Sequence, residues 1–276
     1  MTIPAAAIPA VVGLTLLVLS AAPVFLSRNP TIISRWITWC VVAVLTGVAQ
    51  LLGVWGAVAL AILIGILCGV EYAKLVGLRA LDLCVLLIAC VTLPVMAAVG
   101  REWLSAYLPY ILLAGAVLPF LFGDLATSAR RSACTAFGIL WLAWAPSQVV
   151  PLHAHLTLVV LVVAVTDVAS WATGKLLGWL PLLRIRPFVV SPNKTLAGLL
   201  GGALAAGVTL ALLGYFTVLL FLIFAIGAPL GDLLASAFKR GAGVKEAGSW
   251  LPGFGGLLDR ADSLLLVLPL AALILQ

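Results

Sequence analysis

Four polar residues with helical spacing lie near the C-terminal end of the sequence. Residues 231–263 read GDLLASAFKRGAGVKEAGSWLPGFGGLLDRADS, and the polar residues at its start recur at intervals of four, three and one. An α-helix would carry residues with this spacing on one face. They are Asp232, Ser236, Lys239 and Arg240. A carboxylate, a hydroxyl and two cations on one face are suited to binding phosphate groups and their counter-ions.

A glycine-rich loop follows these residues and ends in two aspartates. Glycines let the backbone approach a phosphate closely, and Lys245 adds a cation. Asp259 and Asp262 flank Arg260 at the start of the last apolar segment and share a helical face. Because Mg²⁺ prefers carboxylate and phosphate oxygens, the pattern indicates metal-assisted phosphoryl or nucleotidyl chemistry on a lipid. Snorkelling basic residues on a helical hairpin would explain the cations but not the aspartates.

Two further polar features lie upstream. Asp167 interrupts the apolar run LVVAVTDVASWATGK, and an acidic residue inside such a run is by default a functional candidate. A group of short polar residues with one cation precedes the next apolar segment: Ser191, Asn193, Lys194 and Thr195. Free N–H groups at a helix start beside a lysine would form an anion site. A helix cap with a topology-setting lysine explains the group equally well.

The elements that hold these residues are apolar segments of membrane-spanning length. Hydrophobic residues make up 64% of the 276 residues and charged residues 9%, with a mean hydropathy of +1.29. An ordinary soluble domain has roughly 25% charged residues, so the composition excludes a soluble protein, and it excludes disorder as well. We expect an all-α, polytopic membrane helical bundle of about ten transmembrane helices. The predicted spans are 5–26, 36–52, 54–71, 81–100, 106–122, 133–150, 156–176, 195–213, 215–235 and 258–275.

Basic residues set the expected orientation of these spans. Lys and Arg occur in every loop that follows an odd-numbered span, and Arg101 is the one basic residue on the other side. The positive-inside rule therefore makes the odd-to-even loops cytoplasmic and both termini non-cytoplasmic. Residues 36–71 are interpreted as two short helices with a break near Gly53. The first span has no basic residue before it and is interpreted as a retained helix rather than a signal peptide. Charged residues before position 160 are expected at loop ends.

At these residues the sequence resembles the phosphatidate cytidylyltransferase family, also called CDP-diacylglycerol synthase. The family signature has a serine before Lys-Arg, then Lys-Asp, a Pro-Gly-His-Gly-Gly loop and Asp-Arg-x-Asp. The matching positions here are Ser236, Lys239, Arg240, Lys245, Glu246, Pro252–Gly256 and Asp259–Asp262. Residues 167–175 and 191–202 resemble two other family patterns, and Glu71 with Tyr72 resembles a weaker acidic–aromatic pair. The resemblance covers about residues 35–276.

Three positions depart from the family pattern. Glu246 replaces an aspartate and keeps its charge, and Ala261 stands where a larger apolar residue or threonine is usual. Phe254 replaces the loop histidine and keeps neither its acid–base nor its hydrogen-bonding capacity. Either the histidine is not needed for the chemistry, or this chain is a divergent member.

The resemblance implies transfer of a cytidylyl group from CTP to phosphatidate or a related lipid phosphate, giving CDP-diacylglycerol and pyrophosphate. It implies a Mg²⁺-dependent site, with a second cation as an option, in which Asp232 and Asp259 are metal ligands. The candidate catalytic residues are Asp232, Asp259 and Lys239. The candidate substrate-binding residues are Ser191, Lys194, Thr195, Ser236, Arg240, Lys245, Arg260, Asp167 and Asp262. Metal, ribose or structural roles are all open for the last two.

The same resemblance implies a setting and partners. We expect a multi-pass protein of the cell membrane, of the bacterial inner-membrane type, with its active site at the cytoplasmic face. Its partners would be CTP, the lipid phosphate, membrane lipids and, by analogy, a second copy of the chain, with no nucleic acid. We expect an additional N-terminal helix and loop in residues 1–34, a helical membrane region in 35–160 and a catalytic membrane region in 161–276.

Two other functions fit parts of the pattern. A CTP-dependent polyprenol or lipid kinase has a related C-terminal motif, and it would release CDP rather than pyrophosphate. A catalytically weakened paralogue that binds lipid would explain Phe254, although the retained aspartates argue against it. A transporter is disfavoured because the polar residues gather at one membrane edge rather than at the midplane.

Overall fold

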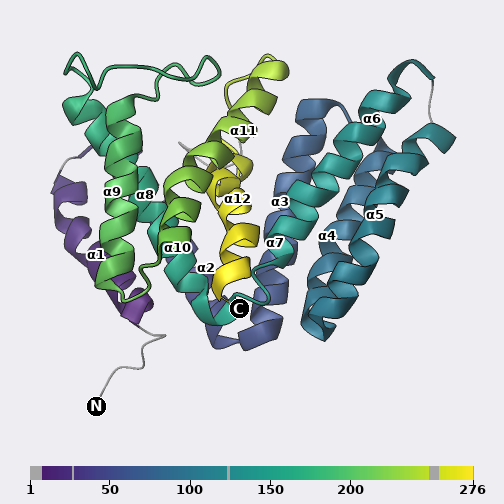
Figure 1. Ribbon diagram of the computed structural model, residues 1–276, viewed down its shortest axis with the longest axis horizontal. Coiled ribbons are helices and arrows are strands. Elements are labelled where there is room, and N and C mark those ends of the chain that lie inside the picture. The colour runs from purple at the N-terminus through teal and green to yellow at the C-terminus, as the bar shows by residue number, and fades with distance from the viewer. Residues whose placement is uncertain (1–7, 27, 123–124, 249–254, 276) are drawn as a thin grey trace.

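The computed structural model describes residues 8–26, 28–122, 125–248 and 255–275, and these residues form helices and no β-strand (Figure 1). The α-helices are α1 (Ile8–Leu26), α2 (Pro30–Leu51), α3 (Gly53–Val76), α4 (Ala80–Val99), α5 (Arg101–Leu121), α6 (Leu125–Gly138), α7 (Ala145–Ser147), α8 (Leu156–Leu177), α9 (Leu196–Leu212), α10 (Val218–Leu222), α11 (Ala228–Gly241) and α12 (Leu258–Leu275). π-Helical turns at Ile139–Trp144 and Ile223–Gly227 join α6 to α7 and α10 to α11, and a 3₁₀ turn at His153–His155 precedes α8. The predicted all-α fold is confirmed.

Seven helical segments in the described part of the chain are long and apolar enough to cross a membrane. They are Ile8–Leu26, Ile32–Leu51, Gly53–Val76, Ala80–Val99, Arg101–Leu121, His153–Leu177 and Val218–Gly241. The predicted span 133–150 is divided between α6, a π-helical turn and α7. Helix α9 has 17 residues, and α12 has 18 and carries three charges in its first turns. The multi-pass helical character is therefore supported, and the count of ten stays a prediction.

The break between α2 and α3 lies where the glycines predict it. Leu52 separates the two helices, and Gly53 has a φ of +65°, which favours glycine. A side chain at Gly56 would overlap the carbonyl oxygen of Ala49. Residues 36–71 therefore form parts of two helices, as expected, and α3 extends five residues beyond the predicted end of its span.

Two buried apolar cores share α3 and α12. One core joins α3 to α8, α9 and the end of α12, and it includes Ala57, Val159, Leu210 and Leu268. The other joins α3 to α4, the first π-helical turn and the start of α12, and it includes Cys68, Leu86, Leu142 and Leu265. Helix α12, yellow in Figure 1, lies centrally in the bundle between these two cores. The start of α12, which carries two of the candidate aspartates, is packed in the second of these cores.

One pair of charges in the first half of the chain is buried instead of lying at loop ends as expected. Asp82 on α4 and Arg131 on α6 form a bidentate ion pair, with both nitrogen–oxygen distances at 2.7 Å. The carboxylate also accepts the backbone N–H of Arg79 at 3.0 Å. The two side chains are exposed by 5% or less. Burial without a partner would be costly, so this pair joins the start of α4 to α6.

Candidate active site

Three helices bring the candidate residues together. Helices α8, α11 and α12 contact one another, and α11 and α12 lie side by side in the middle of the bundle (Figure 1). A side chain at Gly231 would overlap the backbone of Asp262 and Ser263. The glycine therefore lets α11 approach α12 closely beside two of the candidate aspartates.

Helix α11 forms as its polar spacing predicts, but only part of its predicted polar face turns inward. Ser236 and Lys239 are buried, and the Ser236 hydroxyl donates a hydrogen bond to Asp232 Oδ1 at 3.3 Å. Arg240 is exposed, and it donates to the carbonyl of Val244 at 3.1 Å. Arg240 therefore lies at the exposed edge of this polar face, and its role in substrate binding stays a prediction.

Asp259 organises both ends of the loop between α11 and α12. Its Oδ1 is 2.5 Å from Lys239 Nζ. Its Oδ2 accepts the backbone N–H groups of Ala247 at 2.8 Å and Gly256 at 3.0 Å. The Asp259 side chain is only 7% exposed. One carboxylate thus joins α11, the two ends of the loop and α12.

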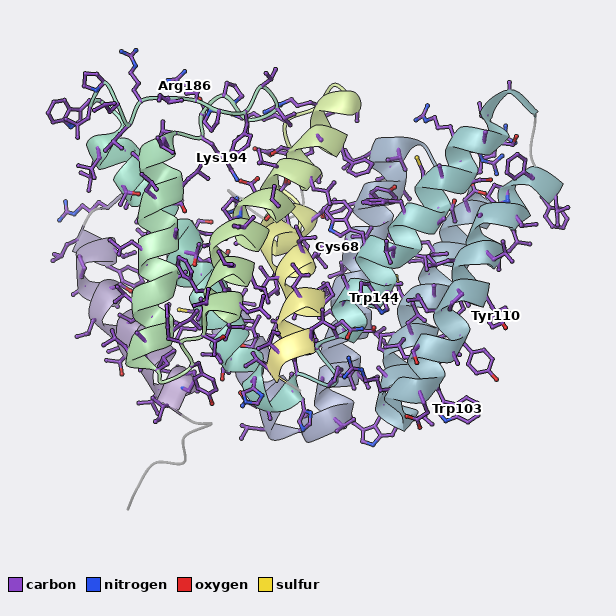
Figure 2. The ribbon with its side chains drawn as sticks, in the orientation of Figure 1. Cys68, Trp103, Tyr110, Trp144, Arg186 and Lys194 are labelled. Atoms are coloured by element: carbon purple, nitrogen blue, oxygen red, sulfur yellow. The ribbon has the colours of Figure 1, made fainter. Side chains whose placement is uncertain are left out.

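Asp232 is held by a lysine from a different part of the chain. Lys194 Nζ lies 2.8 Å from Asp232 Oδ2 and donates to the carbonyl of Pro229 at 3.0 Å. Lys194 lies in the loop between α8 and α9, nearer to the helices than Arg186 of the same loop (Figure 2). The Asp232 side chain is 37% exposed, so it can reach a ligand from outside the bundle.

Asp167 and Asp262 complete a group of carboxylates. The hydroxyl of Ser263 donates to Asp167 Oδ1 at 3.3 Å, and its backbone N–H lies 2.8 Å from Asp262 Oδ1. Asp262 is 6% exposed, and its backbone lies against Gly231, the neighbour of Asp232 on α11. The sequence-predicted Asp167, Asp232 and Asp262 therefore converge from three helices, and Lys194 and Lys239 lie next to them.

Glu71 is a residue of this region to which sequence reasoning assigned no role. It lies on α3 and is 4% exposed. Its Oε1 accepts the N–H of Leu257 at 2.9 Å, and its Oε2 accepts the N–H of Leu258 at 2.7 Å. These N–H groups lie at the start of α12, immediately before Asp259. The rule that singles out Asp167, an acidic residue inside an apolar run, would have found Glu71 as well.

The start of α9 is closed by its own chain and is not an open anion site. The N–H of Leu196 donates to the carbonyl of Ile185 at 2.9 Å, and that of Ala197 to the carbonyl of Leu183 at 3.1 Å. The N–H of Gly198 donates to the Thr195 hydroxyl, which caps the helix. Of the two interpretations of this group, the helix cap is the one that the structure supports, and the anion site with free N–H groups is contradicted. Thr195 acts as a helix cap, and Lys194 is the member of the group that reaches the carboxylates.

The remaining candidates lie at the edge of this group. Ser191 is half-buried, and its carbonyl accepts the N–H of Lys194 at 3.1 Å. Lys245 is exposed in the loop after α11. Arg260 is exposed on α12. Phe254, the departure from the family loop, lies outside the described residues.

The sequence profile of the cytidylyltransferase family matches residues 33–276. This chain belongs to the cytidylyltransferase family. The predicted resemblance is confirmed, and the matched region includes every candidate site residue. The division into segments at residues 34 and 160 stays a prediction.

Two curated relatives of this chain are named phosphatidate cytidylyltransferase. The chain is 40% identical to the phosphatidate cytidylyltransferase of Staphylococcus haemolyticus over 124 residues, which is 42% of this chain and 46% of the relative. It is 35% identical to that of Staphylococcus saprophyticus over 178 residues, 60% of this chain and 66% of the relative. The matched segments therefore span about half to two thirds of these relatives.

The carboxylates of this cytidylyltransferase-family chain fit a Mg²⁺ ion whose other ligands come from water and from a bound substrate. No three of the described His, Cys, Asp and Glu side chains converge closely enough to form a complete metal site. Mg²⁺ is commonly held by one or two carboxylates together with water and substrate phosphates. Asp232 fits this role because it is partly exposed. Asp259 already accepts three hydrogen bonds or ion-pair contacts, and a carboxylate offers about four acceptor positions.

Proposed function

We propose that this protein transfers a cytidylyl group from CTP to a lipid phosphate of the phosphatidate type, giving CDP-diacylglycerol and pyrophosphate. The observation that carries the proposal is the convergence of three aspartates from α8, α11 and α12 with Lys239 of α11 and with Lys194 of the loop between α8 and α9. The name of the curated relatives supports the same reaction. The kinase alternative has no such support.

The reaction needs positioning and charge neutralisation more than proton transfer. An oxygen of the lipid phosphate attacks the α-phosphorus of CTP, the new phosphorus–oxygen bond forms, and pyrophosphate leaves with the bonding electron pair. A phosphate monoester is largely anionic near pH 7 (its second pKa is about 6), so no strong general base is required. This is consistent with phenylalanine at position 254, where the family has histidine.

The chain's own residues supply the neutralising charges. We assign Lys239, Lys245 and Arg260 to the triphosphate, and Lys194 and Ser236 to either phosphate group. Asp232 would hold Mg²⁺, Asp259 is the second candidate ligand, and Asp167 and Asp262 are candidates for a second cation. When bound, Mg²⁺ neutralises phosphate charge and orients the phosphates. Lys194 and Lys239 are held in position by Asp232 and Asp259. Their side chains therefore need not rearrange as charge develops on the phosphates during the reaction.

We also propose a membrane orientation for this reaction. The chain would cross a bacterial inner membrane ten times, with both termini outside the cytoplasm and the site at the cytoplasmic face. The positive-inside distribution of Lys and Arg supports this orientation. A homodimer is proposed by family analogy alone.

The reaction is tested with purified protein, phosphatidate, Mg²⁺ and CTP that carries the label in either its α- or its γ-phosphate. We expect label from α-labelled CTP in the lipid product, and release of labelled pyrophosphate from γ-labelled CTP. Label that enters the lipid from the γ-phosphate would instead establish the kinase. Nucleotide binding without turnover in either form would favour the weakened paralogue.

Replacing Lys194 by Gln is expected to lower kcat/KM about tenfold or more, because a hydrogen bond to a charged group contributes roughly 1.5–3 kcal/mol. The substitution removes the cation that holds Asp232 at 2.8 Å. Steady-state assays in which CTP and lipid are varied separately measure the effect. Lys74→Gln is the matched control, because Lys74 is exposed in the last turn of α3. Equal activity of the two variants would remove Lys194 from the site.

A further inference from the structure

The loop between α8 and α9, residues 178–195, is held against the helical bundle at one end (Figure 1). The carbonyls of Leu183 and Ile185 accept N–H groups from the first turn of α9. Lys194 at the end of the loop is fixed to Asp232 and Pro229. These contacts fix the position of the α8–α9 loop relative to the candidate active site.

This loop presents large apolar side chains outward. Trp179 is 73% exposed, Leu182 80% and Val189 97%, and Ile185 between them is 54% exposed. Large exposed apolar side chains gathered in one short segment indicate a contact with a membrane or with another protein. Tryptophan is enriched where a membrane meets water, because its ring is apolar and its N–H is polar. The loop joins the ends of two apolar helices, so it lies at the level where a bilayer surface would be.

The same loop is strongly basic. Arg184 and Arg186 are exposed and alternate with the apolar residues, and Arg186 lies on the outer side of the loop (Figure 2). Lys175, just before the loop, has its Nζ 5.2 Å from the centre of the Trp171 ring. The sequence has no Asp or Glu between Asp167 and Asp232. Interleaved cations and apolar side chains without acidic residues are complementary to anionic headgroups above acyl chains.

We propose that the α8–α9 loop rests on the headgroup layer and that Arg184 and Arg186 bind anionic phospholipid headgroups there. Trp179, Leu182 and Val189 dip below the headgroups, and the arginines lie among the phosphates. The lipid phosphate of the proposed reaction is itself anionic, so the loop concentrates that substrate beside Lys194. This last step rests on the proposed function, whereas headgroup binding does not.

Kinetics in mixed vesicles test the substrate-gathering step. The double variant Arg184→Gln/Arg186→Gln is assayed while the mole fraction of phosphatidate in phosphatidylcholine is varied. Each basic residue near an anionic surface contributes about 1 kcal/mol, so for the two arginines together we expect the apparent KM for the lipid to rise about thirtyfold. The kcat and the KM for CTP should stay unchanged. The control Arg28→Gln/Lys74→Gln removes two other exposed cations and should leave the lipid KM unchanged. Equal lipid KM values for the two double variants would overturn this step.

Depth measurements test headgroup binding without any enzyme activity. Leu182 is replaced by Cys in a Cys84→Ser background, since Cys84 is exposed, and labelled with a fluorophore. In vesicles that contain anionic lipids brominated near the glycerol backbone, we expect strong quenching, and weaker quenching when Arg184 and Arg186 are both Gln. An unquenched, water-exposed probe would overturn the proposal. So would a shielded probe that cross-links to a second copy, because a protein would then cover the loop. Quenching without turnover would leave the headgroup contact standing and the proposed reaction refuted.

Discussion

Replacing Asp259 by Asn is expected to lower turnover about a thousandfold while the protein still folds. Asp259 receives Lys239 at 2.5 Å and the N–H groups of Ala247 and Gly256. An asparagine keeps the shape but loses the charge, and its NH₂ group must face either the lysine or the N–H donors. Removing one preorganised electrostatic contact commonly lowers kcat about 10²–10³-fold, and here the buried Lys239 also loses its partner.

Initial rates with saturating CTP and lipid measure this effect, and a thermal melt checks the fold. Glu102→Gln is the control, because Glu102 is an exposed acid at the start of α5. The double variant Asp259→Asn/Lys239→Met should be hardly slower than Asp259→Asn alone, because residues that act as a unit are not additive. A single variant that keeps more than about a tenth of the rate would contradict both the metal and the positioning roles of Asp259.

Replacing Glu71 by Gln is expected to lower kcat about thirtyfold, although Glu71 touches none of the other candidate residues in the contacts described above. Its two oxygens accept the N–H groups of Leu257 and Leu258, and glutamine can accept only one of them. A buried donor left without a partner costs about 1–3 kcal/mol, and about 2 kcal/mol corresponds to roughly thirtyfold in rate. Glu71 is therefore a positioning residue for Asp259. Hydrogen exchange at Leu257 and Leu258 should accelerate in the variant, while the KM for CTP changes little.

A pair of glycine substitutions tests the same contact from the other side. A side chain at Gly256 would overlap the Glu71 carboxylate, whereas one at Gly241 would meet nothing within 4 Å. Gly256→Ala should therefore reproduce the kinetics and the hydrogen exchange of Glu71→Gln, and Gly241→Ala should resemble the unaltered protein. If Glu71→Gln were slow but its amide exchange normal, Glu71 would act on the reaction in some way other than by holding α12.

Features that depend on local sequence could be predicted. The break at Gly53 follows from glycine's conformational freedom, and the spacing of Asp232, Ser236 and Lys239 follows from the helical repeat. The choice of Asp167 as a functional candidate follows from the cost of an acidic residue in an apolar helix. These inferences need only the chemistry of a few neighbouring residues.

Features that depend on which segments meet in space could not be predicted. The residues next to Lys194 in the sequence do not show that it pairs with Asp232 rather than with Asp259. They also do not show that the carbonyls of Leu183 and Ile185 accept the first N–H groups of α9. Predicted span 133–150 is interrupted by a π-helical turn, which no periodicity in an apolar run reveals.

The closed start of α9 and the Glu71 contact differ in how far apart their partners lie along the chain. All the groups that accept or donate hydrogen bonds at the start of α9 lie within residues 183–198. This end of the α8–α9 loop can therefore form while the ribosome is still adding the C-terminal helices. The Glu71 carboxylate instead accepts N–H groups from Leu257 and Leu258, which lie 186 and 187 positions downstream in the chain. Domains form from the N-terminal side during synthesis, and the buried Glu71 carboxylate has these two partners only after α12 has inserted. The site is therefore complete only when the last helix has been synthesised and inserted. A chain that ends before residue 258 would lack both Asp259 and the N–H group of Leu258 that Glu71 accepts.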